Sequence, residues 1–159
     1  KSLLRNKDAT SPLSEFTKGG FQTVIPDSRD LKADKVKRVI ACSGKVYYDL
    51  RQERRTRGID NIAIIRLEQL YPFPSDDLRD AMKQYKNFKE VMWCQEEPMN
   101  QGAWYSSQHK MRRVAQDLKA DVPLTYAGRE ASASPAAGYP ALHMEQMRQY
   151  LDQAMTLKK

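Results

Sequence analysis

Short apolar runs alternate with segments of helical periodicity from Val36 onward, and this alternation limits the fold more than any other feature of the sequence. The run Ile62–Leu67 is almost continuous Ile, Ala and Leu, which is typical of a strand covered on both faces in a parallel sheet. Parallel neighbours need crossover helices, so the pattern predicts an α/β domain, a three-layer sandwich with a mainly parallel sheet. The expected strands are residues 36–42, 62–67, 91–94 and 123–126.

Apolar residues at helical spacing predict helices near residues 45–57, 75–85, 103–118 and 141–156. Gly58 is the expected end of the first helix, because glycine readily adopts the left-handed conformation found there. Ser75 is the expected N-cap of the second helix, whose apolar stripe is Leu78, Ala81, Met82 and Tyr85. The last helix is expected to pack through Leu142, Met147, Tyr150, Leu151 and Ala154.

Residues 1–35 are rich in polar residues and breakers, and they read as an extended connecting segment packed on a domain of residues 36–159. The chain begins at Lys1 rather than Met, so we expect it to be a piece of a longer protein. Apolar residues that could pin the segment to a surface are Leu3, Leu4, Leu13, Phe16, Phe21, Val24 and Ile25.

Charge and composition weigh against two classes of function. The net charge is +7, but the basic run Arg51–Arg57 has no interleaved aromatic residues, so we expect a solvated helix face and no nucleic-acid partner. The apolar runs are only a few residues long, far below the roughly 20 that cross a bilayer, so no membrane partner is expected. Cys42 and Cys94 each end an apolar run, which suits reduced core thiols in an intracellular protein.

The motifs of a self-sufficient enzyme are missing from the sequence. His109 and His143 form no metal-binding spacing, and there is no glycine-rich phosphate loop or G-x-S-x-G elbow. The adjacent Glu96 and Glu97 could be a pair for acid–base work, but we expect them to bond to loop amides or to a partner chain. We therefore predict neither a catalytic nor a metal site in this chain.

The loops that follow the four strands should gather at one edge of the sheet, where α/β domains usually bind ligands and partners. They are Ser43–Lys45, Glu68–Tyr71, Gln95–Gly102 and Gly128–Pro135. Several strings in and around these loops resemble, in order along nearly the whole chain, the end of the first component of 2-oxoglutarate dehydrogenase. The clearest are Cys42–Leu50, Ile64–Pro74, Trp93–Pro98, Asn100–Trp104, Tyr126–Arg129 and Ser132–Ala136.

The resemblance implies a transketolase-type carboxyl-terminal domain in a homodimeric enzyme of the tricarboxylic acid cycle. Such an enzyme decarboxylates 2-oxoglutarate on thiamine diphosphate and passes the succinyl group to the dihydrolipoyl succinyltransferase component. Thiamine diphosphate and Mg²⁺ would be held by earlier domains, so this chain alone is expected to bind neither and to be inactive. The expected location is the bacterial cytoplasm, or the mitochondrial matrix in a eukaryote.

The resemblance also implies two sets of site residues. Loop residues expected at the dimer contact are Gln95, Glu96, Glu97, Asn100, Gln101, Trp104, Arg129, Ser132 and Ser134. Residues expected to bind a regulatory acetyl-CoA are Lys1, Thr17, Gly20, Phe21, Arg66, Gln69 and Leu70.

The effector assignment leaves alternatives open. Gly20 has no side chain where a relative uses a basic group, so weak binding, or replacement of acetyl-CoA by AMP, is expected. Arg66 could instead pair with Glu68 or a neighbouring carboxylate, with Lys1 in solvent. The alternatives for the chain as a whole are a nucleic-acid-binding domain and a free-standing α/β ligand-binding module.

Overall fold

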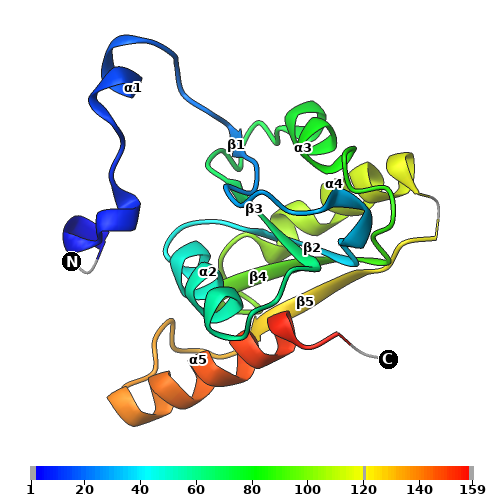
Figure 1. The fold of residues 1–159 in the computed structure, drawn as a ribbon. Helices are drawn as coiled ribbons and strands as arrows, with labels where there is room; N and C mark the ends of the chain where they lie inside the picture. Colours follow the sequence, from blue (N-terminus) through cyan, green and yellow to red (C-terminus); the bar gives the residue numbers. More distant parts are fainter. Residues whose placement is uncertain (1–2, 120, 158–159) are drawn as a thin grey trace.

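The computed structural model describes residues 3–119 and 121–157, and these residues surround one twisted sheet (Figure 1). The strand order is β1-β3-β2-β4-β5. Strands β3, β2, β4 and β5 are parallel, and the two-residue β1 joins β3 in the antiparallel sense. The strands are β1 (Val24–Ile25), β2 (Arg38–Cys42), β3 (Ile62–Leu67), β4 (Glu90–Pro98) and β5 (Leu124–Arg129).

Helices cover both faces of the sheet, as the alternating pattern predicts (Figure 1). One buried cluster joins β-strand residues such as Ile40 and Cys42 to α2 (Val46–Thr56) and α5 (Pro140–Met155). The other joins residues such as Val39 and Ala41 to α3 (Ser75–Met82) and α4 (Trp104–Leu118). Successive residues of a strand face opposite sides, so β2 contributes to both cores and the three-layer prediction is confirmed.

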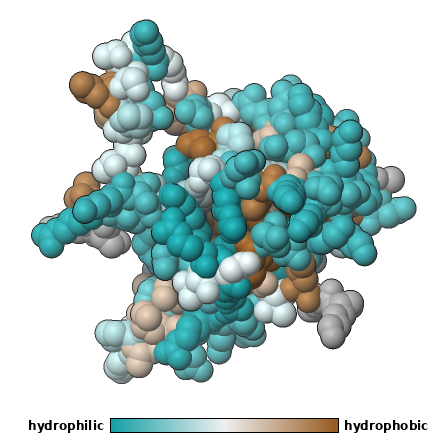
Figure 2. All heavy atoms as spheres, in the orientation of Figure 1, coloured by the Kyte–Doolittle hydropathy of each residue, from teal (hydrophilic) through white to brown (hydrophobic). Residues whose placement is uncertain are grey.

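The first part of the chain extends beyond the domain (Figure 1) and approaches it at Asp8, whose carboxylate lies 3.9 Å from the guanidinium of Arg51. It contains α1 (Leu13–Thr17) and the single-turn helices Leu3–Arg5 and Lys7–Ala9, while a third such turn, Ala33–Lys35, precedes β2. Residues 11–22 are all exposed. Four of the expected anchors are therefore wrong, because they are 73–85% exposed: Leu4, Leu13, Phe16 and Phe21. Figure 2 shows apolar atoms among polar ones on this arm, residues 3–22.

The part of the connecting segment that packs on the domain is β1 and the residues after it. Val24 is 8% exposed and joins the core under α3. The carbonyl of Thr23 accepts from the amides of Glu68 and Gln69, which extends the contact beyond the strand. The segment is thus held at the edge of β3 by backbone pairing and by Val24, while Leu4, Leu13, Phe16 and Phe21 do not anchor it.

Most predicted elements form close to their expected bounds, with three differences. Strands β4 and β5 continue to Pro98 and Arg129, beyond the apolar runs that predict them. Ser75 is not an N-cap: it is the first helical residue, because the carbonyl of Pro74 already accepts the first helical bond, from Leu78. Leu142 is 42% exposed, since only the second half of α5 packs on the sheet.

The basic run on α2 also differs from expectation. Arg54 is 3% exposed, because it turns from the helix into the space beside the edge of the sheet. Arg51 and Arg57 keep about a third of their side-chain surface in solvent. No helix in the described part of the chain has the length and apolar character of a membrane span.

Candidate functional site at the carboxyl edge of the sheet

The loop after β4 is organised by the amide of Gln95, which is 2% exposed. Its Oε1 accepts from the indole Nε1 of Trp93 at 2.8 Å and from the backbone amide of Trp104 at 3.1 Å. An indole N–H can only donate, so these contacts fix which end of the amide is the oxygen. Gln95 therefore joins the strand to the first turn of α4.

The other end of Gln95 holds the turn itself. Its Nε2 lies 3.0 Å from the carbonyl oxygen of Pro98 and 2.8 Å from that of Gln101. Gly102 then approaches closely: a Cβ at this position would lie 3.0 Å from the Gln95 side-chain oxygen, and its φ is +65°. Glycine is required here both for the left-handed conformation and for space.

A second set of bonds ties this loop to the loop after β5. Asn100 donates from Nδ2 to the carbonyl of Ser132 at 3.0 Å and accepts from the Ser132 amide at 2.9 Å. Gln101 donates to the same carbonyl. Arg129 bonds to Gln146 of α5, at 2.8 Å, and to the carbonyl of Pro135. The two loops and α5 therefore form one connected surface.

The nine residues predicted at a dimer contact all lie at this edge, but in different environments. Glu97 is exposed, and Glu96 lies 3.7 Å from the ammonium of Lys45. Trp104 is only 8% exposed and packs on Tyr126, with ring centroids 5.1 Å apart. Gln95 and Trp104 thus shape the surface from below, while the others are at least partly accessible: Glu96, Glu97, Asn100, Gln101, Arg129, Ser132 and Ser134.

A hollow of about 230 Å³ opens beside Gln95 at the same edge. Its lining includes the serines Ser43 and Ser106, the half-exposed Leu70 and the carboxylate residue Glu97. Glu97 is the only carboxylate residue in the lining, so the hollow offers contact surface and hydrogen bonds but no acid–base pair. Within the described residues no three His, Cys, Asp or Glu side chains are placed to hold a metal ion.

Arg66, the central residue of the predicted effector set, is held by three side chains at the end of β3. Its guanidinium lies 4.8 Å from the ring centroid of Tyr47 and donates to the hydroxyl of Tyr48 at 2.9 Å. Its Nε is 2.7 Å from Glu68 Oε1, an ion pair whose geometry makes no aligned hydrogen bond. The pairing with Glu68 that the sequence left open is therefore present.

The structure brings only part of the effector set together. Gln69 and Leu70 follow Arg66 in one loop, with Gln69 donating to the carbonyl of Pro72. Phe21 lies across β1 on the α3 side, in a hollow with Asp77 and Asp80, whereas Arg66 packs on α2. Thr17 and Gly20 are on the exposed arm, and Lys1 is outside the described residues.

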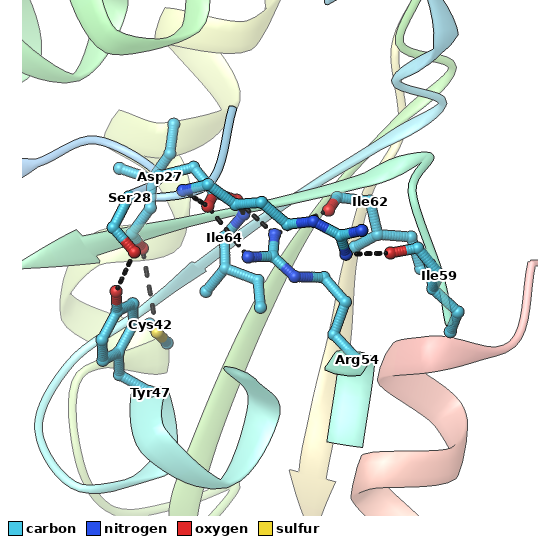
Figure 3. Close-up of polar contacts among 10 residues, drawn as sticks. Asp27, Ser28, Cys42, Tyr47, Arg54, Ile59, Ile62 and Ile64 are labelled. Atoms are coloured by element: carbon cyan, nitrogen blue, oxygen red, sulfur yellow. Dashed lines mark hydrogen bonds and ion pairs between the residues drawn. The ribbon is translucent and has the colours of Figure 1, made fainter. Parts of the chain in front are cut away.

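A buried ion pair that the sequence did not suggest fastens the connecting segment to the sheet (Figure 3). Asp27 accepts from both terminal nitrogens of Arg54 and, at 2.7 Å, from the backbone amide of Ile64. Arg54 also donates to the carbonyl of Ile62 at 3.0 Å. The side chain of Arg54 is 3% exposed and that of Asp27 is 1% exposed. Together they bond to the backbone edge of β3 where β1 has ended.

Cys42 and Cys94 are free thiols in register on β2 and β4, and both are buried. Burial in an apolar core raises the pKa of each thiol well above its ordinary value, because the thiolate would lose its hydration. Thiols of this kind are packing groups rather than nucleophiles.

The parallel sheet with an antiparallel edge strand, covered by helices on both faces, places the chain among transketolase-like carboxyl-terminal domains. A family profile described as "2-oxoglutarate dehydrogenase C-terminal" matches residues 10–155, and the chain belongs to that family. The free-standing alternatives are therefore not favoured.

Relatives match over almost all of this chain. It is 55% identical over 157 residues to the 2-oxoglutarate dehydrogenase E1 component of Azotobacter vinelandii, covering 99% of this chain and 17% of the relative. It is 55% identical over 159 residues to that of Cupriavidus necator, covering 100% and 16%. It is 41% identical to the mitochondrial 2-oxoglutarate dehydrogenase of Schizosaccharomyces pombe, covering 98% and 16%. The chain thus spans about a sixth of these relatives.

Proposed function

We propose that this chain is the carboxyl-terminal domain of a 2-oxoglutarate dehydrogenase E1 component and serves the oxidative decarboxylation of 2-oxoglutarate. The observation that carries the proposal is 55% identity over 157 residues, 99% of the chain, to a relative of that name. In this proposal the whole protein transfers a succinyl group to a dihydrolipoyl succinyltransferase component. It works in the bacterial cytoplasm.

The domain's own contribution is structural. Thiamine diphosphate and Mg²⁺ belong to other domains in this proposal, because the described residues offer neither a metal-ligand cluster nor a glycine-rich phosphate loop. The joined loops at the carboxyl edge supply a surface for the second subunit of a homodimer. Amide and hydroxyl groups at Asn100, Gln101 and Ser132, above the buried Trp104, give the polar rim and firm base that such contacts need.

Calorimetry and turnover measurements test the division of labour. We expect the whole protein to bind thiamine diphosphate with Mg²⁺ and to decarboxylate 2-oxoglutarate. The chain of residues 1–159 should do neither. Micromolar binding of the cofactor to this chain alone, or a whole protein without activity on 2-oxoglutarate, would contradict the proposal.

Substitution of Trp104 tests the structural role. Trp104→Ala in the whole protein removes the ring that supports the edge beside Tyr126. We expect a lower melting temperature or a larger monomer fraction in sedimentation, with the KM for 2-oxoglutarate nearly unchanged. Tyr105→Ala is the control, since Tyr105 is the next residue along the helix and is 57% exposed. An unchanged melting temperature and sedimentation profile for Trp104→Ala would count against the role.

The second part of the proposal is regulation by acetyl-CoA or AMP near the end of β3. The candidate residues are Lys1, Thr17, Gly20, Phe21, Arg66, Gln69 and Leu70. Support comes from Arg66, whose side chain is 19% exposed and whose buried Nε has no aligned hydrogen-bond partner, so that the guanidinium can exchange Glu68 for a phosphate oxygen. Because Phe21 and Arg66 lie on opposite sides of β1, binding requires the arm to move.

Titration of both nucleotides into the whole protein tests this site. Arg66→Ala should weaken binding about tenfold, the loss expected for one charge-assisted hydrogen bond of about 1.4 kcal/mol. Arg79→Ala, a change on the α3 side of the sheet, should leave the affinity unaltered. The site is wrong if neither nucleotide binds, or if both bind Arg66→Ala as well as wild type.

A further inference from the structure

Four arginines line one hollow between the segment after β1 and helix α2. The hollow has a volume of about 330 Å³, and its lining residues are Ser28, Arg29, Arg51, Arg54 and Arg55. This volume falls at the lower end of the range for small-molecule sites, roughly 300–1,000 Å³. None of these side chains is a carboxylate or an aromatic ring. The hollow is therefore a place where positive charge and hydrogen-bond donors dominate.

The positive charge of Arg54 is already balanced by a buried carboxylate. Asp27 bonds to two nitrogens of its guanidinium, and one carboxylate oxygen also accepts from the amide of Ile64 (Figure 3). Both oxygens of Asp27 are thus engaged at the edge of the sheet. Asp27 therefore neutralises Arg54 and fixes the floor of the hollow, but it makes no bond to the other three guanidinium groups.

The other three arginines are incompletely balanced. Arg29 donates to the carbonyl of Ile59 at 2.8 Å, and that partner carries no net charge. Arg55 is exposed, and its guanidinium makes no ion pair or hydrogen bond with residues 3–119 or 121–157. Arg51 lies 3.9 Å from the carboxylate of Asp8, on the arm. Three permanent positive charges thus face one carboxylate, which leaves an excess of two.

We infer that this hollow binds the diphosphate group of a small phosphorylated molecule, such as a nucleoside diphosphate. A diphosphate carries two or more negative charges, which matches the excess, and its oxygens suit the paired donors of guanidinium groups. The lining has no ring on which a base could stack, so the diphosphate itself is the recognised group. The site uses neither Arg66 nor Gln69 and does not rest on the proposed catalytic or regulatory function.

The arm competes for the same site in this arrangement. Asp8 is the carboxylate beside Arg51, so a diphosphate that binds Arg51 must displace Asp8 or share the arginine with it. Removing the charge of Asp8 should therefore tighten binding rather than weaken it. Loss of the Asp8 charge should thus change pyrophosphate affinity in the opposite direction to loss of an arginine charge. This contrast distinguishes a ligand site from a general effect of net charge on stability.

Calorimetric titration of inorganic pyrophosphate into the whole protein tests the inference. We expect Arg29→Gln and Arg55→Gln each to weaken binding about tenfold, as for the loss of one charged hydrogen-bonding group. Asp8→Asn should tighten binding several-fold. Arg57→Gln is the matched control, because it removes the same charge at the residue that follows α2, outside the hollow. Binding of pyrophosphate at other sites of the whole protein is the same in every variant, so the difference between variants reports on the hollow.

Several outcomes would overturn the inference. One is the absence of pyrophosphate binding in wild type, and another is equal binding in wild type, Arg29→Gln and Arg55→Gln. Duplex DNA that binds through these arginines while pyrophosphate does not would replace the diphosphate with a nucleic-acid backbone. Melting temperatures are measured alongside. If Arg29→Gln alone lowers the melting temperature through its lost bond to Ile59, the exposed Arg55→Gln still decides the matter.

Discussion

At the scale of single residues, the carboxyl edge depends on one uncharged amide. Gln95 accepts from two buried donors, the indole of Trp93 and the backbone amide of Trp104, and donates to the carbonyls of Pro98 and Gln101. Buried polar groups without partners cost about 1–3 kcal/mol each, whereas a satisfied set costs little. The stability of the loop is therefore concentrated in a side chain that has no chemical role of its own.

Replacement of this amide by a similarly sized apolar group should be costly. We expect Gln95→Leu to lower the free energy of unfolding by about 3 kcal/mol, because several buried donors and acceptors lose their partner at once. Urea unfolding of the chain measures this. Gln116→Leu on the exposed side of α4 should change it by less than about 0.5 kcal/mol. A loss below about 1 kcal/mol for Gln95→Leu would mean that the loop re-forms around other partners.

The buried pair of Asp27 and Arg54 should show strong coupling. Removing one partner leaves the other charge buried, so Arg54→Met and Asp27→Leu should each cost about 3–5 kcal/mol, while the double variant should cost much less than their sum. A double-mutant cycle by urea unfolding gives the coupling free energy. Additive losses would show that the two charges act separately.

At the scale of elements, the predictions succeeded where local signals agree. Strand β3 has the predicted bounds Ile62–Leu67, because a continuous apolar run has few alternatives in an α/β domain. Helix α2 ends before Gly58, whose φ of +63° is the conformation expected after a helix. Strand β1 was not predicted, since two residues carry no periodicity and their pairing with β3 depends on residues far along the chain.

The candidate site was predictable to a smaller extent than the fold. The topology alone brings the loops after β4 and β5 to one edge, so the nine proposed contact residues do lie there. Gln95 was expected in the loop because the apolar run that predicts β4 ends at Cys94, so its burial inside the longer strand was missed. The burial of Arg54 was missed because its partner Asp27 is 27 residues away.

The last turn of α5 should depend on a residue from β2. Arg38 is 2% exposed, bonds to Glu90, and donates to the carbonyls of Gln153 and Ala154 at 3.1 and 2.6 Å. A cation at these carbonyls also balances the negative end of the helix dipole. We expect Arg38→Met to speed hydrogen exchange of the last α5 amides at least tenfold, and Arg148→Met, on the exposed side of α5, to leave it unchanged. Equal exchange in both would refute this.

At the scale of the whole molecule, the buried thiol and phenol groups predict that the stability of the fold falls at alkaline pH. Burial raises the pKa of Cys42 and Cys94, and it raises that of Tyr85 to about 12. In the unfolded chain these groups lose their protons at lower pH, so unfolding releases protons above about pH 8.5. Stability is therefore fully present below that pH and declines as pH rises toward the raised values.

The expected decline is about 1.4 kcal/mol per pH unit for each thiol once the unfolded form is ionised. Urea unfolding from pH 7 to 10 measures it, with a slope near zero at the lower end. Cys94→Ala should lower stability at every pH but reduce the alkaline slope by about half. A slope that is the same in Cys94→Ala and wild type would mean that other groups cause the decline.

The connecting segment also determines where this chain can be shortened. Strand β1 pairs with Leu67 and Arg66, and beyond it Asp27 and Arg54 bond to the backbone of Ile64 and Ile62. A version that starts at residue 30 would lose β1 and Asp27, and it would present Ile64–Leu67 as an open strand edge, a template for adding a strand from another copy. We expect such a truncation to aggregate, whereas one that starts at residue 22 should stay dispersed. Light scattering of the two proteins would show whether eight residues of an apparent linker keep the molecule soluble.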